Sequence, residues 1–214
     1  MSEYGSEFRV IETLGWSAFG GAARINRHLA RMQATCAELG IDFPEEQLRH
    51  LVNGVTGFAS QRLRLTVDPD GQGALEQFDM PDSSAKWTVS IASQRLDSAD
   101  PWLRRKTTKR ALYLQARSDM PAGVDEVLFL NERDELCEGT ISNIFVRRNV
   151  RLLTPPVSCG LLPGILRQEL LDVGRAEEEV LTVKDLKIAK AIFFGNSLRS
   201  LIPAEVIFSD DQRV

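Results

Sequence analysis

The chain has 214 residues, of which 43% are hydrophobic and 26% are charged, and its formal net charge is −4. That length can bury the core of one large domain or two small ones, and the charge balance gives no reason to expect a nucleic-acid or membrane partner. The cysteines, Cys36, Cys137 and Cys159, are odd in number and far apart, so they predict neither a disulfide framework nor a metal site. The N-terminus lacks an apolar signal block, and we expect a cytoplasmic protein.

The first part of the chain is predicted to contain two helices and several strands. Ile25, Leu29, Met32 and Leu39 recur at helical spacing, which is typical of an amphipathic helix. The expected elements are a strand at Phe8–Leu14, helices at Ala23–Leu39 and Pro44–Val55, and strands at Leu63–Val67 and Trp87–Ala92.

The segment Asp97–Pro101 is short, polar and contains proline, which makes it the candidate linker. It predicts one domain over residues 1–97 and a second over residues 98–214. The elements expected after it are a helix at Arg105–Arg117, strands at Glu126–Leu130, Asn143–Val146 and Arg151–Thr154, a helix at Ile165–Val173 and a strand at Ala191–Phe194.

Two segments could bind an anion. Pro163-Gly164 stands directly before a predicted helix, whose free N–H groups and positive dipole end suit a phosphate. The second segment, Asn196–Arg199, follows a buried strand with small and hydroxyl residues. Each segment alone is more commonly an ordinary helix start or strand end.

Charged residues add further candidates with two interpretations each. Lys106 and Lys109 lie in a cationic run, which fits either a solvated helix face or a reactive lysine with a lowered pKa. Glu138, between small residues and before an apolar strand, is either a solvated turn residue or a buried acid that needs a cationic partner. Arg31, beside Met32, either reaches inward to an anion or extends to water.

Together and in this order, these segments resemble the class IV (fold-type IV) pyridoxal phosphate enzymes. The family includes branched-chain aminotransferase, D-amino acid aminotransferase and 4-amino-4-deoxychorismate lyase. Its signature is matched by Glu138, Thr140, Asn143–Phe145, Leu152–Thr154 and Leu162–Arg167. The segments His28–Met32, Lys106–Arg110 and Asn196–Arg199 are also similar to the family.

The resemblance implies a role for each matching residue. Lys106 would carry the pyridoxal phosphate covalently and later move the proton at the substrate Cα. Glu138 would keep the pyridine nitrogen protonated, so that the ring acts as an electron sink, and Leu162 would pack on one ring face. The phosphate would be held by Arg31, Ile165, Leu166, Ser197 and Leu198.

The resemblance further implies the two-domain class IV fold, an α+β/α/β architecture with a small α+β domain and a larger barrel-like domain. It also implies a homodimer and a cofactor site between the domains. Family members have a longer segment before the strand predicted at Phe8–Leu14, where this chain has only Met1–Glu7. We therefore expect part of the substrate wall to be open, rebuilt or supplied by a dimer partner.

Three functions are compatible with these features. The stretches Phe8–Leu14, Asp100–Arg110 and Asn131–Phe145 look most like 4-amino-4-deoxychorismate lyase-like proteins, which release pyruvate and 4-aminobenzoate from an amine substrate. The first alternative is an aminotransferase acting on branched-chain or other small amino acids. The second is a pyridoxal phosphate-binding homologue with weak or no catalysis.

Overall fold

The computed structural model describes residues 8–82 and 85–208, so Met1–Glu7 lies outside the described residues. These residues divide into two compact units. The first unit holds residues 8–82 together with Arg105–Lys109, and the second holds residues 85–104 and 110–208.

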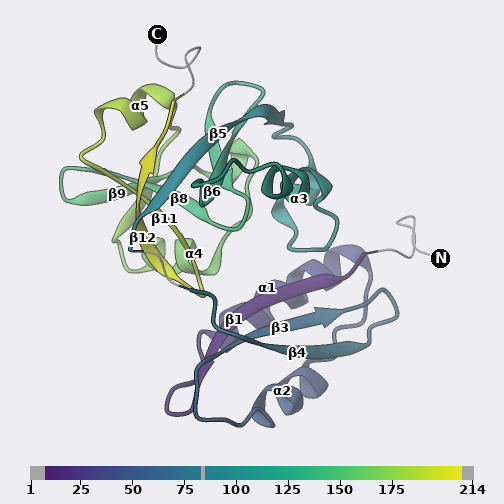
Figure 1. The fold of residues 1–214 in the computed structure, drawn as a ribbon. Helices are drawn as coiled ribbons and strands as arrows, with labels where there is room; N and C mark the ends of the chain where they lie inside the picture. The colour runs from purple at the N-terminus through teal and green to yellow at the C-terminus, as the bar shows by residue number, and fades with distance from the viewer. Residues whose placement is uncertain (1–7, 83–84, 209–214) are drawn as a thin grey trace. The chain divides into compact units, whose positions relative to one another are not determined.

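The first unit combines one antiparallel sheet with two helices. In its described part, the strand order is β2 (Gly21–Ala22), β1 (Val10–Ser17), β3 (Gln61–Val67) and β4 (Gly73–Asp79). The helices are α1 (Ile25–Leu39) and α2 (Glu45–Asn53). Figure 1 shows β1, β3 and β4 side by side with the two helices beside them.

Register explains which face of this sheet the helices cover. Val10, Glu12 and Leu14 alternate along β1 and pair with Val67, Leu65 and Leu63 of β3. All of these side chains are buried, and Glu12 contacts α1, so this face is the helix-covered one. The opposite face carries Ile11, Thr13 and their partners.

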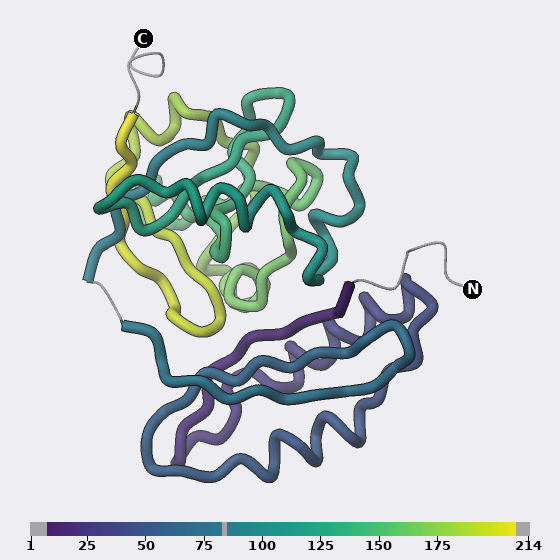
Figure 2. Tube along the Cα trace, turned by 45° about the vertical axis from the view of Figure 1, so that its right-hand side comes forward, coloured from purple at the N-terminus to yellow at the C-terminus, as the bar shows by residue number. Residues whose placement is uncertain are grey.

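The second unit is built around a sheet that closes on itself. Its described strands are β5 (Trp87–Leu96), β6 (Glu126–Asn131), β7 (Leu136–Gly139), β8 (Asn143–Arg148), β9 (Arg151–Thr154), β10 (Ala176–Glu178), β11 (Ala191–Asn196) and β12 (Ser200–Val206). The order is β10-β9-β8-β11-β12-β5-β6-β7, and an additional β7–β8 pairing closes the run from β8 to β7 into a barrel. Figure 2 shows this winding. Val89, Leu128, Ile144 and Phe194, each 0% exposed, belong to the hydrophobic core cluster of this unit.

Helices and short turns connect the strands of the second unit. They are η1 (Pro101–Arg104), α3 (Ala111–Ser118), η2 (Val157–Cys159), α4 (Ile165–Asp172) and α5 (Val183–Ile188). Within the described residues, no helix is both long and apolar enough to cross a membrane.

The observed division of the chain differs from the sequence-based one. The predicted linker Asp97–Pro101 lies inside the second unit, because β5 extends to Leu96 and pairs with β6 and β12. The chain instead changes unit at residue 82, then returns to the first unit for Arg105–Lys109. Composition did not reveal this excursion, because five residues are too few to show a pattern of their own.

Candidate active site

The segment before α3 is extended, so the helix predicted for Arg105–Arg117 is wrong in its first part. The helix begins at Ala111, and Thr107 forms an antiparallel bridge with Val10 of β1. Two features oppose helix here. β-Branched threonines favour extended backbone, and the edge of β1 offers hydrogen-bond partners to their peptide groups.

Lys106 is held on this extended segment. Its carbonyl accepts a hydrogen bond from the Ile11 amide over 2.9 Å. Because successive residues of a strand face opposite sides, the Lys106 side chain lies on the face opposite that of Thr107, which is buried on the helix-covered side. Lys106 is half-buried, whereas Lys109 is exposed. This difference favours Lys106 as the reactive lysine, a choice that the sequence pattern alone left open.

Two arginines of β3 lie on the same face of the sheet as Lys106. Thr13 pairs with Arg64, and Arg62 precedes Arg64 by two residues, so both arginines share the face of Ile11 and therefore of Lys106. Strand spacing and rise place the Cα atoms of Lys106 and Arg64 roughly 12 Å apart. Two long side chains and a small molecule can span that distance.

Each of these arginines retains hydrogen-bonding capacity. Arg62 lies over the Phe78 ring, 4.4 Å from its centroid, and Arg64 Nε lies 3.8 Å from a Glu76 carboxylate oxygen. Both Nε atoms are buried and make no hydrogen bond with any described residue. A buried donor without a partner is costly, so these groups suit an anionic ligand.

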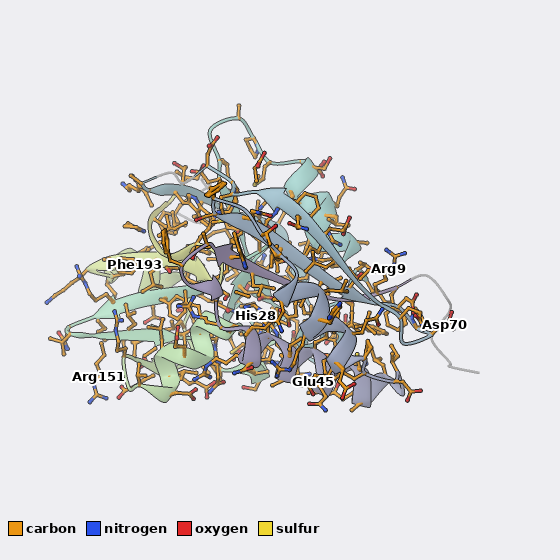
Figure 3. All side chains as sticks on the ribbon, turned by 90° about the horizontal axis from the view of Figure 1, so that it is seen from below. Arg9, His28, Glu45, Asp70, Arg151 and Phe193 are labelled. Carbon is orange, nitrogen blue, oxygen red and sulfur yellow. The ribbon has the colours of Figure 1, made fainter. Side chains whose placement is uncertain are left out.

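Arg31 lies on the other, helix-covered side of the same sheet. Its Nε and Nη2 donate to the two carboxylate oxygens of Glu12 over 2.8 and 2.7 Å. The Nδ1 atom of His28, a residue labelled in Figure 3, lies 2.7 Å from the same carboxylate. Burial alone would raise the pKa of Glu12, but Arg31 and His28 outweigh burial and lower it to about 2. Arg31 therefore does not extend to water: its side chain is 13% exposed and bound to a buried carboxylate.

Glu138 is buried at the end of β7 instead of lying in a solvated turn. Its side chain is 7% exposed. The Tyr113 hydroxyl donates to Oε1 over 2.8 Å, and Asn143 Nδ2 lies 3.4 Å from Oε2. Hydrogen bonds of this kind favour the ionised carboxylate, which is the form that pairs with a cation.

A second buried carboxylate, Glu126, shapes the turn that follows Glu138. Glu126 is 0% exposed and accepts hydrogen bonds from the Thr140 amide and hydroxyl, the Ile141 amide and the Ser142 hydroxyl. A Cβ on Gly139 would lie 2.7 Å from its carboxylate. The turn between β7 and β8 is thus fixed from the inside, and the position of Glu138 with it.

Asn143 connects Glu138 to the loop before α4. Its Nδ2 donates to the Leu162 carbonyl over 3.0 Å, so Leu162, itself half-buried, is tied to the same amide as Glu138. A Cβ on Gly164 would lie 1.9 Å from Asn143 Oδ1, which explains why glycine is required in this loop. Gly164 is the extended N-cap residue of α4.

The two predicted phosphate segments are brought together within the second unit. Ile165 and Leu166 form the first turn of α4, where backbone N–H groups lack intrahelical acceptors. A Cβ on Gly195 would lie 2.8 Å from Leu166, so the end of β11 packs against this turn. The turn after β11 contains Ser197, which is buried, and Leu198, whose amide donates to Asn196 Oδ1 over 3.0 Å.

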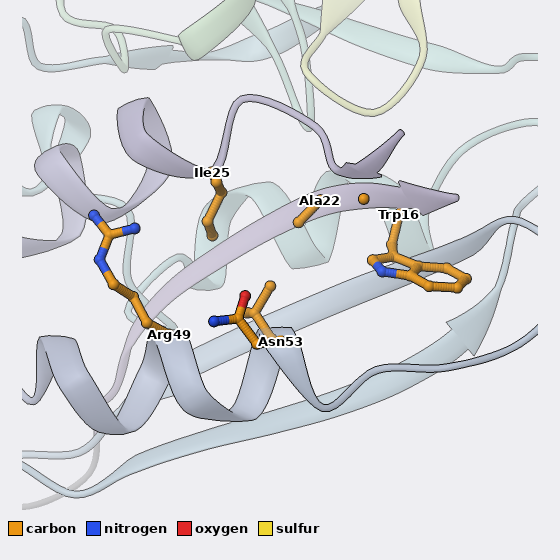
Figure 4. A pocket seen from close by; sticks show the side chains of 7 residues that line it. Trp16, Ala22, Ile25, Arg49 and Asn53 are labelled. Atoms are coloured by element: carbon orange, nitrogen blue, oxygen red, sulfur yellow. The ribbon is translucent and has the colours of Figure 1, made fainter. Parts of the chain in front are cut away.

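A separate cavity lies on the helix-covered side of the first unit. Its volume is about 230 Å³, and Figure 4 shows Trp16, Ile25, Arg49 and Asn53 around it. No residue of the predicted site lines it. Arg49 is engaged with Glu45 over 2.8 Å, which leaves this cavity without a comparable set of converging polar groups.

Sequence reasoning missed several of these contributors. Tyr113, Glu126 and Glu12 were not singled out, although Tyr113 follows Arg110 by three residues, a spacing that places both on one side of a helix. Nothing in the local sequence indicated that Glu126 organises a distant turn.

Comparisons with known proteins identify the family of the chain. The sequence profile of the family described as amino-transferase class IV matches residues 9–207, and the chain belongs to that family. A solved structure from Mesorhizobium loti, described as a candidate amino-acid aminotransferase, is 42% identical with a TM-score of 0.88. That match covers 94% of this chain and 100% of the other.

Other relatives carry different activities in their descriptions. A Schizosaccharomyces pombe protein described as a candidate aminodeoxychorismate lyase is 28% identical over 195 residues, covering 86% of this chain and 84% of the relative. A Mycobacterium tuberculosis structure described as a hypothetical aminotransferase in a PLP-bound form is 22% identical with a TM-score of 0.80, covering 92% of this chain and 80% of the other, and shows the shared fold. Further relatives are described as branched-chain-amino-acid aminotransferase candidates. The family and the fold of the chain are therefore shown.

Proposed function

We propose that this class IV enzyme uses pyridoxal phosphate to release pyruvate from 4-amino-4-deoxychorismate, giving 4-aminobenzoate. The observation that carries the proposal is the face of the first unit that combines Lys106 with Arg62 and Arg64. The substrate has one amino group and two carboxylates, which matches one reactive lysine and two arginines with unsatisfied donors.

The residues present fit the proposed cofactor. Glu138 is a buried carboxylate with hydrogen-bond donors beside both oxygens, as a partner for a protonated pyridine nitrogen should be. Gly164 leaves the start of α4 without a side chain, and Ser197 lies in the neighbouring turn. We propose that Arg31, Ile165, Leu166, Ser197 and Leu198 bind the phosphate and that Leu162 contacts the ring.

Each residue has a defined task in the proposed reaction. Bound pyridoxal phosphate supplies an electron sink for charge that develops beside the substrate nitrogen. Lys106 Nζ removes the proton from the ring carbon that bears the amino group. The bond between the neighbouring ring carbon and the enolpyruvyl oxygen then breaks, pyruvate leaves after taking up a proton, and the ring becomes aromatic. Arg62 and Arg64 orient the carboxylates.

The atoms of this elimination balance without a second substrate. The alternative, an aminotransferase on branched-chain or other small amino acids, requires a 2-oxo acid to complete its cycle. A branched aliphatic side chain would need an apolar wall. The described face around Lys106 carries Ile11 and Phe78 as well as Thr13 and Glu76, and it is the two arginines, Arg62 and Arg64, that favour an anionic substrate.

We further propose that the chain acts as a homodimer. Support comes from the family to which it belongs, and light scattering of the purified protein at several concentrations tests it.

The deciding experiment supplies aminodeoxychorismate to purified protein loaded with pyridoxal phosphate, without any 2-oxo acid. We expect many turnovers to pyruvate and 4-aminobenzoate with the long-wavelength absorbance of the cofactor retained. Bleaching by leucine or valine, restored by 2-oxoglutarate, would assign the aminotransferase activity instead. A spectrum that responds to no substrate would assign a binding protein with weak or no catalysis.

A further inference from the structure

Tyr113 occupies a position that the proposed reaction does not yet use. Its side chain is 7% exposed, and its hydroxyl donates to Glu138 Oε1 over 2.8 Å. The opposite oxygen, Oε2, lies 3.4 Å from Asn143 Nδ2, which is a longer contact. The shorter hydrogen bond therefore fixes one oxygen and turns the other toward a further partner.

The ring of Tyr113 is itself held from two sides. Phe129 of β6 contacts it edge to face with 5.1 Å between the ring centroids, and the Arg110 guanidinium lies 5.0 Å from its centroid. Arg110 also donates to the Thr140 carbonyl in the turn after Glu138. The hydroxyl therefore has little freedom to leave the carboxylate.

We propose that Tyr113 is a positioning residue that acts through Glu138: its hydroxyl keeps the carboxylate ionised and aims Oε2 at the protonated ring nitrogen of the cofactor. The inference rests on the proposed function, because it requires bound pyridoxal phosphate. Without the donor, the carboxylate becomes more basic and draws the proton from the ring nitrogen.

The chemistry of the pair supports this role over a catalytic one. Burial and the neighbouring Glu138 carboxylate raise the pKa of Tyr113 far above its ordinary value. The hydroxyl consequently stays protonated and can only donate to Glu138. Cys137, next to Glu138, is also buried, and burial raises the pKa of its thiol, so it does not compete as a charged group.

The test uses Tyr113→Phe, which removes the hydroxyl and keeps the ring. Holo-protein is prepared with pyridoxal phosphate labelled with ¹⁵N in the ring, and nitrogen NMR reports protonation of that atom. We expect the signal to move toward the neutral form and the dissociation constant of the cofactor to rise about tenfold, as expected for a lost hydrogen bond to a charged group. Ser98→Ala is the matched control, because Ser98 also donates a hydroxyl to a carboxylate, Glu132, over 2.7 Å in the same unit.

A second comparison separates positioning from packing. In a Glu138→Gln background, Tyr113→Phe should change neither the ring-nitrogen signal nor the affinity for the cofactor further, because the carboxylate through which Tyr113 acts is already absent. In a Tyr4→Phe background, Tyr113 is the remaining tyrosine of the sequence, so 3-fluorotyrosine incorporated in place of tyrosine changes this position alone. Because the fluorinated hydroxyl is the stronger hydrogen-bond donor, the ring-nitrogen signal should move toward the protonated form.

The outcomes distinguish this inference from the proposed function. A wild-type protein that binds no pyridoxal phosphate removes the proposed function and this inference together. A wild-type protein that binds it, with an unchanged nitrogen signal in both Tyr113→Phe and the fluorotyrosine protein, overturns the role of Tyr113 alone. A lower melting temperature with an unchanged signal has the same meaning.

Discussion

The two units hold their candidate residues in different ways. In the second unit, Glu138, Leu162 and the start of α4 are tied to one another through Asn143. In the first unit, Lys106 and Arg31 lie on opposite sides of one sheet, Lys106 on a short segment from a distant part of the chain. The second unit therefore holds its candidate residues in one hydrogen-bonded arrangement, whereas the first unit carries separate side chains on one shared sheet.

This contrast predicts how far the effect of a substitution should spread to other candidate residues. A change in the second unit should propagate to neighbouring binding groups, because they share hydrogen bonds. A change in the first unit should leave the other candidate residues in place and affect chemistry at Lys106, substrate orientation at Arg64, or fold stability and cofactor affinity at Arg31. The following predictions test that separation in order of expected effect.

The largest effect is expected for Lys106→Ala, which removes the only group assigned to proton transfer. Turnover should fall on the order of 10⁴-fold, the upper range for loss of a positioned acid–base group. Steady-state assays of the variant measure the rate. Borohydride reduction of the wild-type holo-protein, followed by peptide mass mapping, should place the cofactor on Lys106. Lys109→Ala is the control from the same segment, and an adduct found on Lys109 would reject the assignment.

Arg31→Ala should destabilise the first unit as well as weaken cofactor binding. From the sequence alone we expect only the loss of affinity, but Arg31 also neutralises the fully buried Glu12. Arg31 and His28 together lower the pKa of Glu12 from 4.5 to about 2 against the effect of burial, which corresponds to about 3 kcal/mol of stability at neutral pH, and Arg31→Ala should lose a large part of it. Denaturant unfolding of the variant measures the loss, and Arg95→Ala, whose ion pair with Asp134 is exposed, should cost far less.

The buried Glu12 carboxylate also predicts that the unfolding free energy depends on pH. The folded pKa of Glu12 lies below its unfolded value, so its stabilising contribution is present above about pH 4.5 and disappears as the pH falls toward about 2. The unfolding free energy should therefore decline through this window. In Glu12→Gln the decline should be smaller, and an equally steep decline would show that other carboxylates cause it.

Glu138→Gln should slow turnover by about 10²-fold and leave the cofactor bound, because an amide cannot hold the pyridine nitrogen protonated. Absorbance of the purified variant tests retention of the cofactor, and product formation tests the rate. Glu205→Gln, which changes an exposed carboxylate paired with Lys86, is the matched control. A Glu138→Gln variant with the wild-type rate would leave Glu138 as a purely structural residue.

The smallest effect is expected for Arg64→Gln. Loss of one charged contact to a substrate carboxylate should raise KM about tenfold while kcat changes little, if Arg64 binds ground state and transition state alike. Initial rates over a range of aminodeoxychorismate concentrations give both constants. An unchanged KM would indicate that the arginine face binds something other than this substrate.

The family resemblance predicted the fold class, and apolar runs bounded by turn residues predicted most strands of the second unit. Strands Asn143–Arg148 and Arg151–Thr154 begin where the pattern placed them. Strand Gly73–Asp79 was missed because its exposed positions are mostly polar and it lies at the edge of its sheet. Edge strands lack the strong alternation on which such predictions depend.

The candidate site was predictable only as far as local motifs extend. The signature identified Glu138, Leu162 and the start of α4, and the structure brings them together. It could not identify Tyr113 or Glu126, because their importance arises from hydrogen bonds to residues 25 and 14 positions away. Such contacts depend on strand register, which a single sequence does not specify.

The excursion of Arg105–Lys109 into the first unit has a consequence for anyone who divides this protein. A fragment that ends at residue 82 would contain every strand of the small sheet but would lose the neighbour of β1 at Arg9–Ile11. The exposed strand edge would then be available for pairing with other chains, a common origin of aggregation. A short synthetic peptide covering Arg105–Lys109 should pair with that strand edge, cover it again and return the lysine to its place. Peptides that carry a different amine at position 106 could then be bound in the same way.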